Sequence, residues 1–171
     1  MIEVLVENEY ADDVGEIRSV NDAAFGQAAE GAIVDALRAE GALAISLVAR
    51  REEKVIGHVA LSPVETVTTG ELVLGLGPVG VLPAEQRRGI GSALIRAGLE
   101  RAKAERWDGV VVLGYRAYYR RFGFEPASRF GMRCEYDVPD ESFMAIELTP
   151  AGLSDCAGLV RYHAAFALAA P

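Results

Sequence analysis

One stretch of this 171-residue chain, LGLGPVGVLPAEQRRGIGSA from Leu74 to Ala93, constrains its fold most strongly. It begins as an apolar run typical of a strand, turns at Pro83 and continues into a segment with an apolar stripe at helical spacing. We therefore expect a strand, a polar turn and a helix over 83–106.

Two glycines, Gly89 and Gly91, lie where this helix opens, so no Cβ atom would keep a ligand away from the backbone. The first N–H groups of a helix have no partner within it and lie at the positive end of its dipole. Arg87 and Arg88 add positive charge. The segment Gln86–Ser92 thus predicts a phosphate site, and the alternative is an ordinary connection with a solvated basic turn.

Apolar periodicity places the remaining elements around this unit. The expected elements are a strand over 2–7, helices over 11–25 and 29–40 with Gly41 as a C-terminal cap, an antiparallel hairpin over 43–50 and 54–62, strands over 72–82 and 110–113, a short helix over 117–122, and strands at Phe124, 132–136 and 142–148. The segment 72–113 reads as a right-handed crossover that makes its two strands parallel. The pattern predicts a mixed α/β fold in a single domain, 1–171, with a weakly assigned tail over 149–171.

The composition excludes several classes of protein. A net charge of −8 disfavours nonspecific nucleic-acid binding, and no apolar run is long enough to cross a membrane. The acidic N-terminal segment is unlike a signal peptide, which favours the cytoplasm. The two cysteines, Cys134 and Cys156, are expected as free thiols, and with His163 they are too scattered to predict a metal site.

Two motifs together point to a family. Gln86, Gly89 and Gly91 match Gln/Arg-x-x-Gly-x-Gly/Ala after an apolar strand, and about thirty residues later the chain reads YYRRFGF over 118–124. This pairing resembles the GNAT superfamily, the GCN5-related N-acetyltransferases. Phrases such as GPVGVLP, RRGIGSALIRAGL and VPDESFMAIEL look more narrowly like its YhbS-like branch of predicted acetyltransferases. The resemblance covers roughly 1–148 and is most specific over 74–126.

The resemblance implies the acyl-CoA N-acyltransferase fold, with a central mixed sheet, flanking helices and two parallel strands that part at their C-terminal ends. In that fold the glycine-rich loop holds the pyrophosphate of acetyl-CoA, and the pantetheine arm lies beside the first parted strand as an added strand would. The implied coenzyme-binding residues are Val79, Gly80, Val81, Gln86, Arg87, Arg88, Gly89, Ile90, Gly91, Ser92, Leu113 and Gly114. Gly75, Gly77 and Pro78 in the same strand fit a bulge or a close approach to the backbone, or simply a weak strand.

In the resembled family, a tyrosine four residues before the Gly-Phe pair protonates the departing thiolate. Tyr119 occupies that position, and Tyr118 is the alternative because adjacent helical side chains diverge by about 100°. The chain departs from its relatives in one respect, since Tyr115-Arg116 stands where they tend to carry Asp-Pro. This departure leaves the coenzyme site unchanged but weakens any transfer of an acceptor by analogy.

The general base is poorly specified by the sequence. His58 has a suitable reference pKa near 6.5, although a lone histidine in an apolar strand is more often structural. Glu30 and Glu65 are weaker candidates, and a chain of water molecules is an equal alternative. Cys134 as an acetyl-accepting nucleophile is a remote option, because no histidine stands near it in sequence.

The combined prediction is direct transfer of an acetyl group from acetyl-CoA to an amine that the sequence does not identify, without a metal, nucleic acid or membrane partner. The alternative is an acyl-CoA-binding sensor or partner module on the same fold with little catalysis. Tyr119 favours the enzyme, whereas the unassigned base and Tyr115-Arg116 leave room for the sensor. The sequence predicts no oligomeric state.

Overall fold

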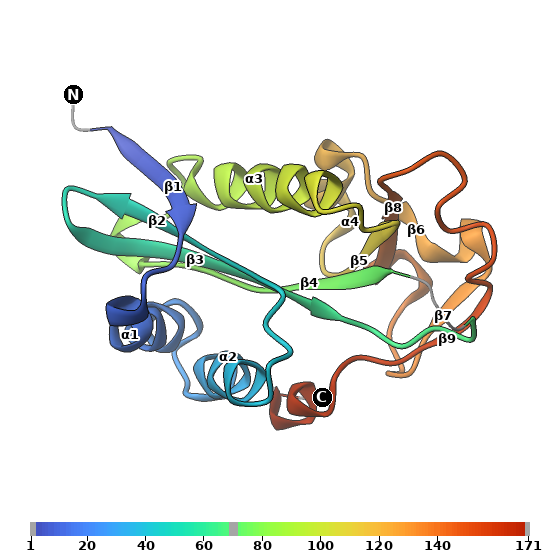
Figure 1. Cartoon of the computed structure of the whole chain (residues 1–171), viewed down its shortest axis with the longest axis horizontal. Helices are drawn as coiled ribbons and strands as arrows, with labels where there is room; N and C mark the ends of the chain where they lie inside the picture. The colour runs from blue at the N-terminus through green and yellow to red at the C-terminus, as the bar shows by residue number, and fades with distance from the viewer. Residues whose placement is uncertain (1–2, 69–71, 170–171) are drawn as a thin grey trace. The chain divides into compact units, whose positions relative to one another are not determined.

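The computed structural model describes residues 3–68 and 72–169 (Figure 1). The chain divides into two compact units. Unit 1 comprises Met1–Leu61, Gly77–Gly98 and Ala164–Pro171, and unit 2 comprises Ser62–Leu76 and Leu99–His163. Three elements, β3, β4 and α3, pass from one unit into the other along the chain. The single domain expected over 1–171 stays a prediction.

The regular elements follow the order expected from periodicity. The strands are β1 Val4–Asn8, β2 Ile45–Arg51, β3 Lys54–Pro63, β4 Val73–Val81, β5 Gly109–Leu113, β6 Glu125–Pro126, β7 Met132–Cys134, β8 Phe143–Glu147 and β9 Gly158–Val160. The α-helices are α1 Val14–Phe25, α2 Ala29–Ala39, α3 Ile90–Ala104 and α4 Arg116–Tyr119. Short 3-10 helices cover Ala11–Asp13, Pro83–Glu85, Arg120–Phe122, Ala127–Phe130, Asp140–Ser142 and Ala164–Ala169.

Unit 1 is built on antiparallel strands. β1 pairs with β2, β2 pairs with β3, and the N–H of Leu82 just after β4 donates to the carbonyl of Ile56 in β3 at 2.9 Å. α1 and α2 cover one face of these strands and the N-terminal part of α3 covers the other (Figure 1). A Cβ on Gly57 of β3 would stand 3.0 Å from Leu94 of α3, so this glycine lets the helix approach the strand.

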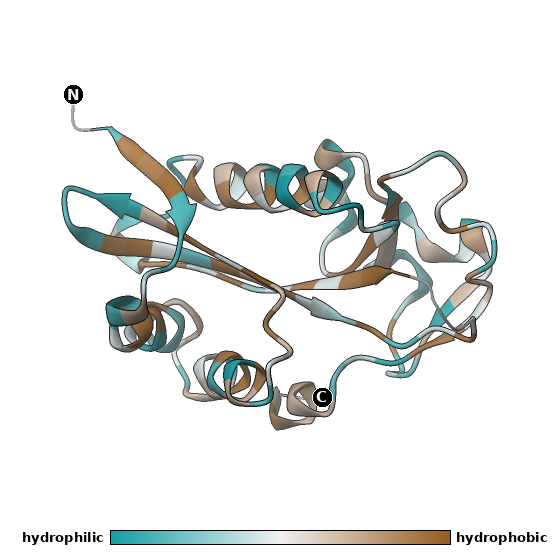
Figure 2. Cartoon of the chain, viewed as in Figure 1, coloured by the Kyte–Doolittle hydropathy of each residue, from teal (hydrophilic) through white to brown (hydrophobic). Residues whose placement is uncertain are grey.

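The two N-terminal helices are amphipathic, as their spacing predicts (Figure 2). Ile17 and Val20 of α1 and Val34 of α2 share a buried core with Val48 and Ala60 of the sheet. Gly26 ends α1 in the left-handed conformation, with a φ of +67°. Gly41 also has a positive φ of +69°, which confirms its expected place after α2.

The C-terminal tail carries structure that the sequence did not reveal. Ala165 and Phe166 of the last 3-10 helix pack against Ile33 and Leu37 of α2 in unit 1. In unit 2, β9 pairs in parallel with β7, and Met132 is the partner of Gly158. Both contacts join segments far apart in sequence, which local periodicity does not report.

Unit 2 contains the start of the parallel crossover. Val73, Leu74 and Gly75 of β4 pair in parallel with Gly109–Val111 of β5, which confirms the predicted crossover. β8 pairs with β5 and β6, antiparallel in both cases. The pairing of β4 with β5 reaches Gly75, whereas β4 continues to Val81, as expected for a parallel split.

Several boundary predictions were wrong in detail. The strand expected at Phe124 covers Glu125–Pro126, after the left-handed turn at Gly123, and the strand expected over 132–136 ends at Cys134. The helix expected from residue 83 starts at Ile90, because Pro83–Glu85 forms a separate 3-10 turn and Arg87 adopts a left-handed φ of +63° that breaks helical geometry. The expected ranges that reach residues 1–2, 69–71 and 170–171 extend there beyond the described residues.

Candidate functional site

The loop before α3 has the geometry of an anion-binding turn. Arg87 and Gly89 both have a positive φ, of +63° and +82°, and the first helical hydrogen bond runs from Ala93 N to Gly89 O at 3.0 Å. Backbone N–H groups in such turns form concave sites for anions. Open space surrounds the position of a Cβ on Gly89, so its conformation, not crowding, favours glycine there.

Side chains join this loop to the end of β4. Gln86 Nε2 donates to the carbonyl of Val81 at 3.0 Å, which ties the predicted phosphate loop to the predicted pantetheine strand. Arg51 and Arg88 both contact Glu85, at 2.5 and 3.4 Å, and the Arg88 side chain is 60% exposed. Within 83–92, Arg87 and Arg88 outnumber the one carboxylate, Glu85, so the loop itself carries net positive charge.

The glycines of β4 have structural causes of their own. A Cβ on Gly80 would stand 3.0 Å from Asn21 Oδ1 of α1, and one on Gly75 would stand 2.8 Å from the Tyr162 ring. Gly77 has a φ of +141°, a conformation that side chains rarely adopt. Close packing and backbone conformation therefore account for these three glycines without a ligand. The assignment of Val79–Val81 to pantetheine stays a prediction.

In unit 2, Tyr119 packs closely against the end of β5. Its ring occupies the space that a Cβ on Gly114 would need, so glycine is required beside it. The ring also meets Phe124 edge to face, with centroids 5.7 Å apart, and Tyr118 at 5.1 Å. The structure thus places Tyr119 beside Leu113-Gly114, and both were predicted as parts of the site.

Burial governs the acidity of Tyr119. Desolvation, with a smaller effect from Tyr118, raises the pKa of Tyr119 to about 12, so its hydroxyl is protonated at neutral pH. The same burial makes it a weaker acid than tyrosine in water, which is the reason to retain Tyr118 as the alternative donor. Tyr115, the departure from related sequences, is 84% exposed and precedes α4.

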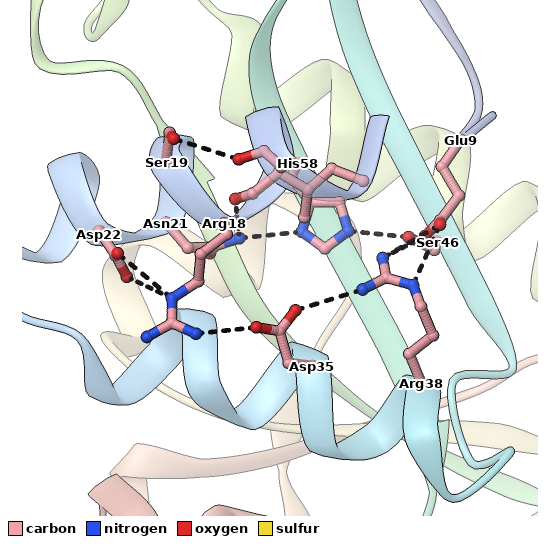
Figure 3. Close-up of polar contacts among 11 residues, drawn as sticks. Glu9, Arg18, Ser19, Asn21, Asp22, Asp35, Arg38, Ser46 and His58 are labelled. Atoms are coloured by element: carbon pink, nitrogen blue, oxygen red, sulfur yellow. Dashed lines mark hydrogen bonds and ion pairs between the residues drawn. The ribbon is translucent and has the colours of Figure 1, made fainter. Parts of the chain in front are cut away.

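His58 lies in a buried polar cluster of unit 1 (Figure 3). Its Nε2 is 2.8 Å from Ser46 Oγ and its Nδ1 is 3.3 Å from Asn21 Nδ2. Asn21 Nδ2 also donates to the carbonyl of Ile17 at 3.0 Å. Because an amide nitrogen only donates, His58 Nδ1 accepts, and its proton lies on Nε2 and is donated to Ser46.

The burial of His58 favours its neutral form. Desolvation, and to a lesser degree the charge of Arg38, lowers the pKa of His58 to about 3. The same cluster contains the ion pairs of Arg38 with Glu9 at 2.9 Å and with Asp35 at 3.4 Å (Figure 3). The hydrogen bonds of His58 with Asn21 and Ser46 give it a clear structural role, and its assignment as general base stays a prediction.

This burial leads to a pH-dependent stability. A folded-state pKa of about 3, below the reference value near 6.5, means that the unfolded chain binds more protons between these values. The stability that comes from keeping His58 neutral is fully present above about pH 6.5 and is lost as the pH falls from there toward the folded-state pKa of about 3. We expect His58→Gln to flatten the decline of Tm between about pH 7 and 5, measured by circular dichroism.

The pH range of this test avoids the carboxylates. Arg50 holds the pKa of Asp13 below its usual value, so the stability from that pair is lost only at lower pH. Ser46→Ala is a matched control, because it removes a partner of His58 and keeps the titrating ring. Parallel Tm profiles for the wild type and His58→Gln would contradict the assigned titration.

The remaining candidate bases and the nucleophile lie elsewhere in the structure. Glu30 accepts from Gln27 Nε2 at 2.7 Å, and the backbone of Glu65 pairs with that of Arg161. Both cysteines are free thiols, as expected, and burial raises the pKa of Cys134, which disfavours its thiolate. Within 3–68 and 72–169, no group of three or more His, Cys, Asp or Glu residues could hold a metal ion. In the same part of the chain, no helix has the length and apolar character needed to cross a bilayer.

The sequence missed most partners of these residues. Asn21 and Ser46 meet His58 from α1 and β2, at separations of 37 and 12 residues, and no local pattern marks them. Asn21 also packs against Gly80, so α1 links His58 to the predicted pantetheine strand. Antiparallel pairing of the predicted hairpin strands β2 and β3 was the one feature that could have indicated that Ser46 lies near His58.

Comparison with known proteins identifies the family. A family model described as an acetyltransferase (GNAT) domain matches residues 8–127. The N-acetyltransferase YhbS of Escherichia coli K12 is 33% identical over 164 residues, which are 95% of this chain and 98% of that protein. The N-acetyltransferase YjhQ of the same strain is 37% identical over 136 residues, 75% of this chain and 74% of YjhQ.

Solved structures agree with this relationship. The crystal structure of Escherichia coli YhbS in complex with CoA superposes with a TM-score of 0.93 at 32% identity, over 98% of this chain and 93% of that one. A GNAT family acetyltransferase from Brucella melitensis in complex with acetyl-CoA gives a TM-score of 0.82 at 40% identity, over 97% and 99%. Fold, motifs and relatives agree that this chain belongs to the GNAT family of acetyltransferases.

Proposed function

We propose that this protein binds acetyl-CoA and transfers the acetyl group directly to a primary amine. The main support for this proposal is the left-handed, glycine-containing turn at the start of α3. Two proteins of similar structure have been solved in complex with CoA and with acetyl-CoA. In this proposal the backbone of Gln86–Ser92 holds the pyrophosphate, and Arg87 and Arg88 meet the phosphates. Val79–Val81 bind the pantetheine arm, and Leu113-Gly114 are the predicted contacts in unit 2.

The acceptor ammonium loses a proton to solvent, and its neutral nitrogen attacks the thioester carbonyl carbon to form a tetrahedral oxyanion. Main-chain N–H groups of β4 would stabilise that oxyanion. Collapse breaks the carbon–sulfur bond, the thiolate takes a proton from Tyr119, and the nitrogen loses its second proton to solvent. Solvent then reprotonates the tyrosinate.

This mechanism assigns the base role to solvent first. His58 has both ring nitrogens engaged and a pKa lowered to about 3, so it would hold a proton poorly at neutral pH. Catalysis that survives in His58→Gln, while coenzyme affinity is unchanged, would support solvent as the base. A selective loss of kcat in that variant would return the role to His58.

Direct transfer and sensing make different products. Incubation with acetyl-CoA and an amine panel, followed by mass spectrometry, should show N-acetylated amine and free CoA. Incubation without an amine should leave the protein itself unmodified. Binding of acetyl-CoA with no turnover of any acceptor would favour the acyl-CoA sensor over the enzyme. An acetylated protein intermediate would contradict direct transfer.

Coenzyme affinity should also depend on salt. Arg88 is largely exposed, so its attraction to the coenzyme phosphates should be screened as the Debye length falls to about 3 Å near 1 M salt. We expect the Kd for acetyl-CoA, measured by calorimetry, to rise with ionic strength. Arg88→Gln should reduce that slope, whereas Arg129→Gln, a control in unit 2, should not. A Kd independent of salt would argue against a basic phosphate site.

A further inference from the structure

A cavity of about 300 Å³ opens in unit 2 beside β7 and the loop that leads to β8. Apolar, aromatic and acidic side chains line it together. Those used below are Met132, Tyr136, Asp137, Val138, Asp140 and Phe143. Its volume lies at the lower end of the range for small-molecule sites.

The cavity adjoins the part of the predicted coenzyme site in unit 2. Phe143, which lines it, is the strand partner of Leu113 across β5 and β8. Gly114 N donates to the carbonyl of Ser142 at 2.9 Å, directly before Phe143. One wall of the cavity is therefore a single strand away from Leu113-Gly114.

The buried ring of Tyr162 packs against the lining of the cavity. This ring stacks on Tyr136 at 6.2 Å and meets Phe143 edge to face at 6.5 Å. The pKa of the buried Tyr162 is raised chiefly by desolvation, and Cys134, Tyr136 and Tyr119 all contribute electrostatically. Tyr162 thus contacts two of the aromatic residues that line the cavity.

The charges of the cavity favour a cation. Asp137 and Asp140 are exposed carboxylates, and Arg133 is the cationic side chain among the described lining residues. Asp140 also accepts a hydrogen bond from Ser128 Oγ at 3.1 Å. Two negative charges against one positive, beside aromatic rings, suit an ammonium group through ion pairing and cation–π contact.

We propose that this cavity is the acceptor site and that it takes a small primary amine with a compact apolar or aromatic body, bound on arrival as its ammonium ion. The inference rests on the proposed acetyl transfer. The carboxylates would attract the ammonium, and Met132, Val138 and Phe143 would hold the apolar body. Proton loss to solvent then gives the attacking amine described above.

Methionine NMR tests the location without catalysis. With ¹³C-methyl methionine labelling, 2-phenylethylamine should shift the Met132 methyl signal in a saturable way, with the core residue Met144 as an internal reference. The neutral isostere 2-phenylethanol should bind with an affinity lower by about 10-fold, because it forms no charge-assisted contact. Equal binding of the two probes, or no response of Met132, would overturn the proposal.

Charge-removing variants test the cause of the preference. Asp137→Asn with Asp140→Asn should abolish the preference for the amine over the alcohol, and Asp137→Asn alone should reduce it without touching the Ser128 contact. Glu141→Gln, an exposed neighbour outside the lining, is the matched control. An amine preference that persists in both aspartate variants would exclude these carboxylates as the recognition groups.

Calorimetry and product analysis separate this inference from the proposed function. If acetyl-CoA fails to bind, the proposed function fails, whatever the amine does. If acetyl-CoA binds and other amines in the panel are acetylated, but amines that bind at Met132 yield no N-acetyl product, only the acceptor assignment fails. In the supporting result, the double variant raises the KM for amines about 10-fold and leaves kcat and the Kd for acetyl-CoA unchanged. A short peptide that displaces the amine and is acetylated in preference would overturn the small-molecule assignment.

Discussion

Replacement of Tyr119 by phenylalanine is expected to lower kcat by about 10²- to 10⁴-fold, the usual loss when one general acid is removed. The change keeps the ring that packs on Gly114 and Phe124 and removes only the hydroxyl. The Tm and the Kd for acetyl-CoA should therefore change little. Because the proton transfer belongs to the transition state, the loss should appear in kcat and equally in kcat/KM.

Tyr118→Phe is the matched control for this experiment. It lies on the same short helix, its ring meets Phe122 at 5.3 Å, and it carries the same hydroxyl. Normal turnover of Tyr119→Phe together with a slow Tyr118→Phe would transfer the role to Tyr118. Normal turnover of both variants would leave solvent as the proton source for the thiolate. Steady-state kinetics at several pH values, with an acceptor found in the amine screen, would decide between these outcomes.

The double variant Gly89→Glu, Gly91→Glu is expected to abolish measurable acetyl-CoA binding. The two carboxylates would place negative charge and bulk at the start of α3, where the proposal places the pyrophosphate. Gly89 has a φ of +82°, so any side chain there also adds backbone strain, although the space around its Cβ position is open. Calorimetry measures the affinity, and circular dichroism verifies that the variant is folded.

The corresponding glutamine variant separates charge from strain. Gly89→Gln, Gly91→Gln has nearly the same size and the same backbone cost as the glutamate variant, without the negative charge. Binding should be weakened by glutamine and lost with glutamate. A folded glutamate variant with wild-type affinity would remove the phosphate loop from its assigned place. Equal losses in both variants would assign the effect to bulk and backbone strain.

The candidate site could be anticipated only in part. Gln86, Gly89 and Tyr119 are predicted as site residues because they stand in short local motifs. The surroundings that set their chemistry could not be found in this way. Burial raises the pKa of Tyr119 and lowers that of His58, and the Asn21 and Ser46 side chains that contact His58 come from distant segments.

The sequence by itself determined the order and type of the main elements. The apolar spacing of α1 and α2, the hairpin of β2 and β3 and the crossover from β4 through α3 to β5 all follow from periodicities of a few residues. Glycines after α1 and α2 marked their ends, because left-handed conformations are readily accessible to glycine.

The tertiary structure alone decided what is joined over long distances. The packing of Ala164–Ala169 on α2, the pairing of β9 with β7 and the aromatic cavity around Tyr136 depend on contacts between segments whose local patterns are weak. Even the start of α3 at Ile90 was set by the left-handed turn at Arg87 rather than by the apolar stripe. Local periodicity reports which face of an element is buried, but only the folded chain determines which surface buries it.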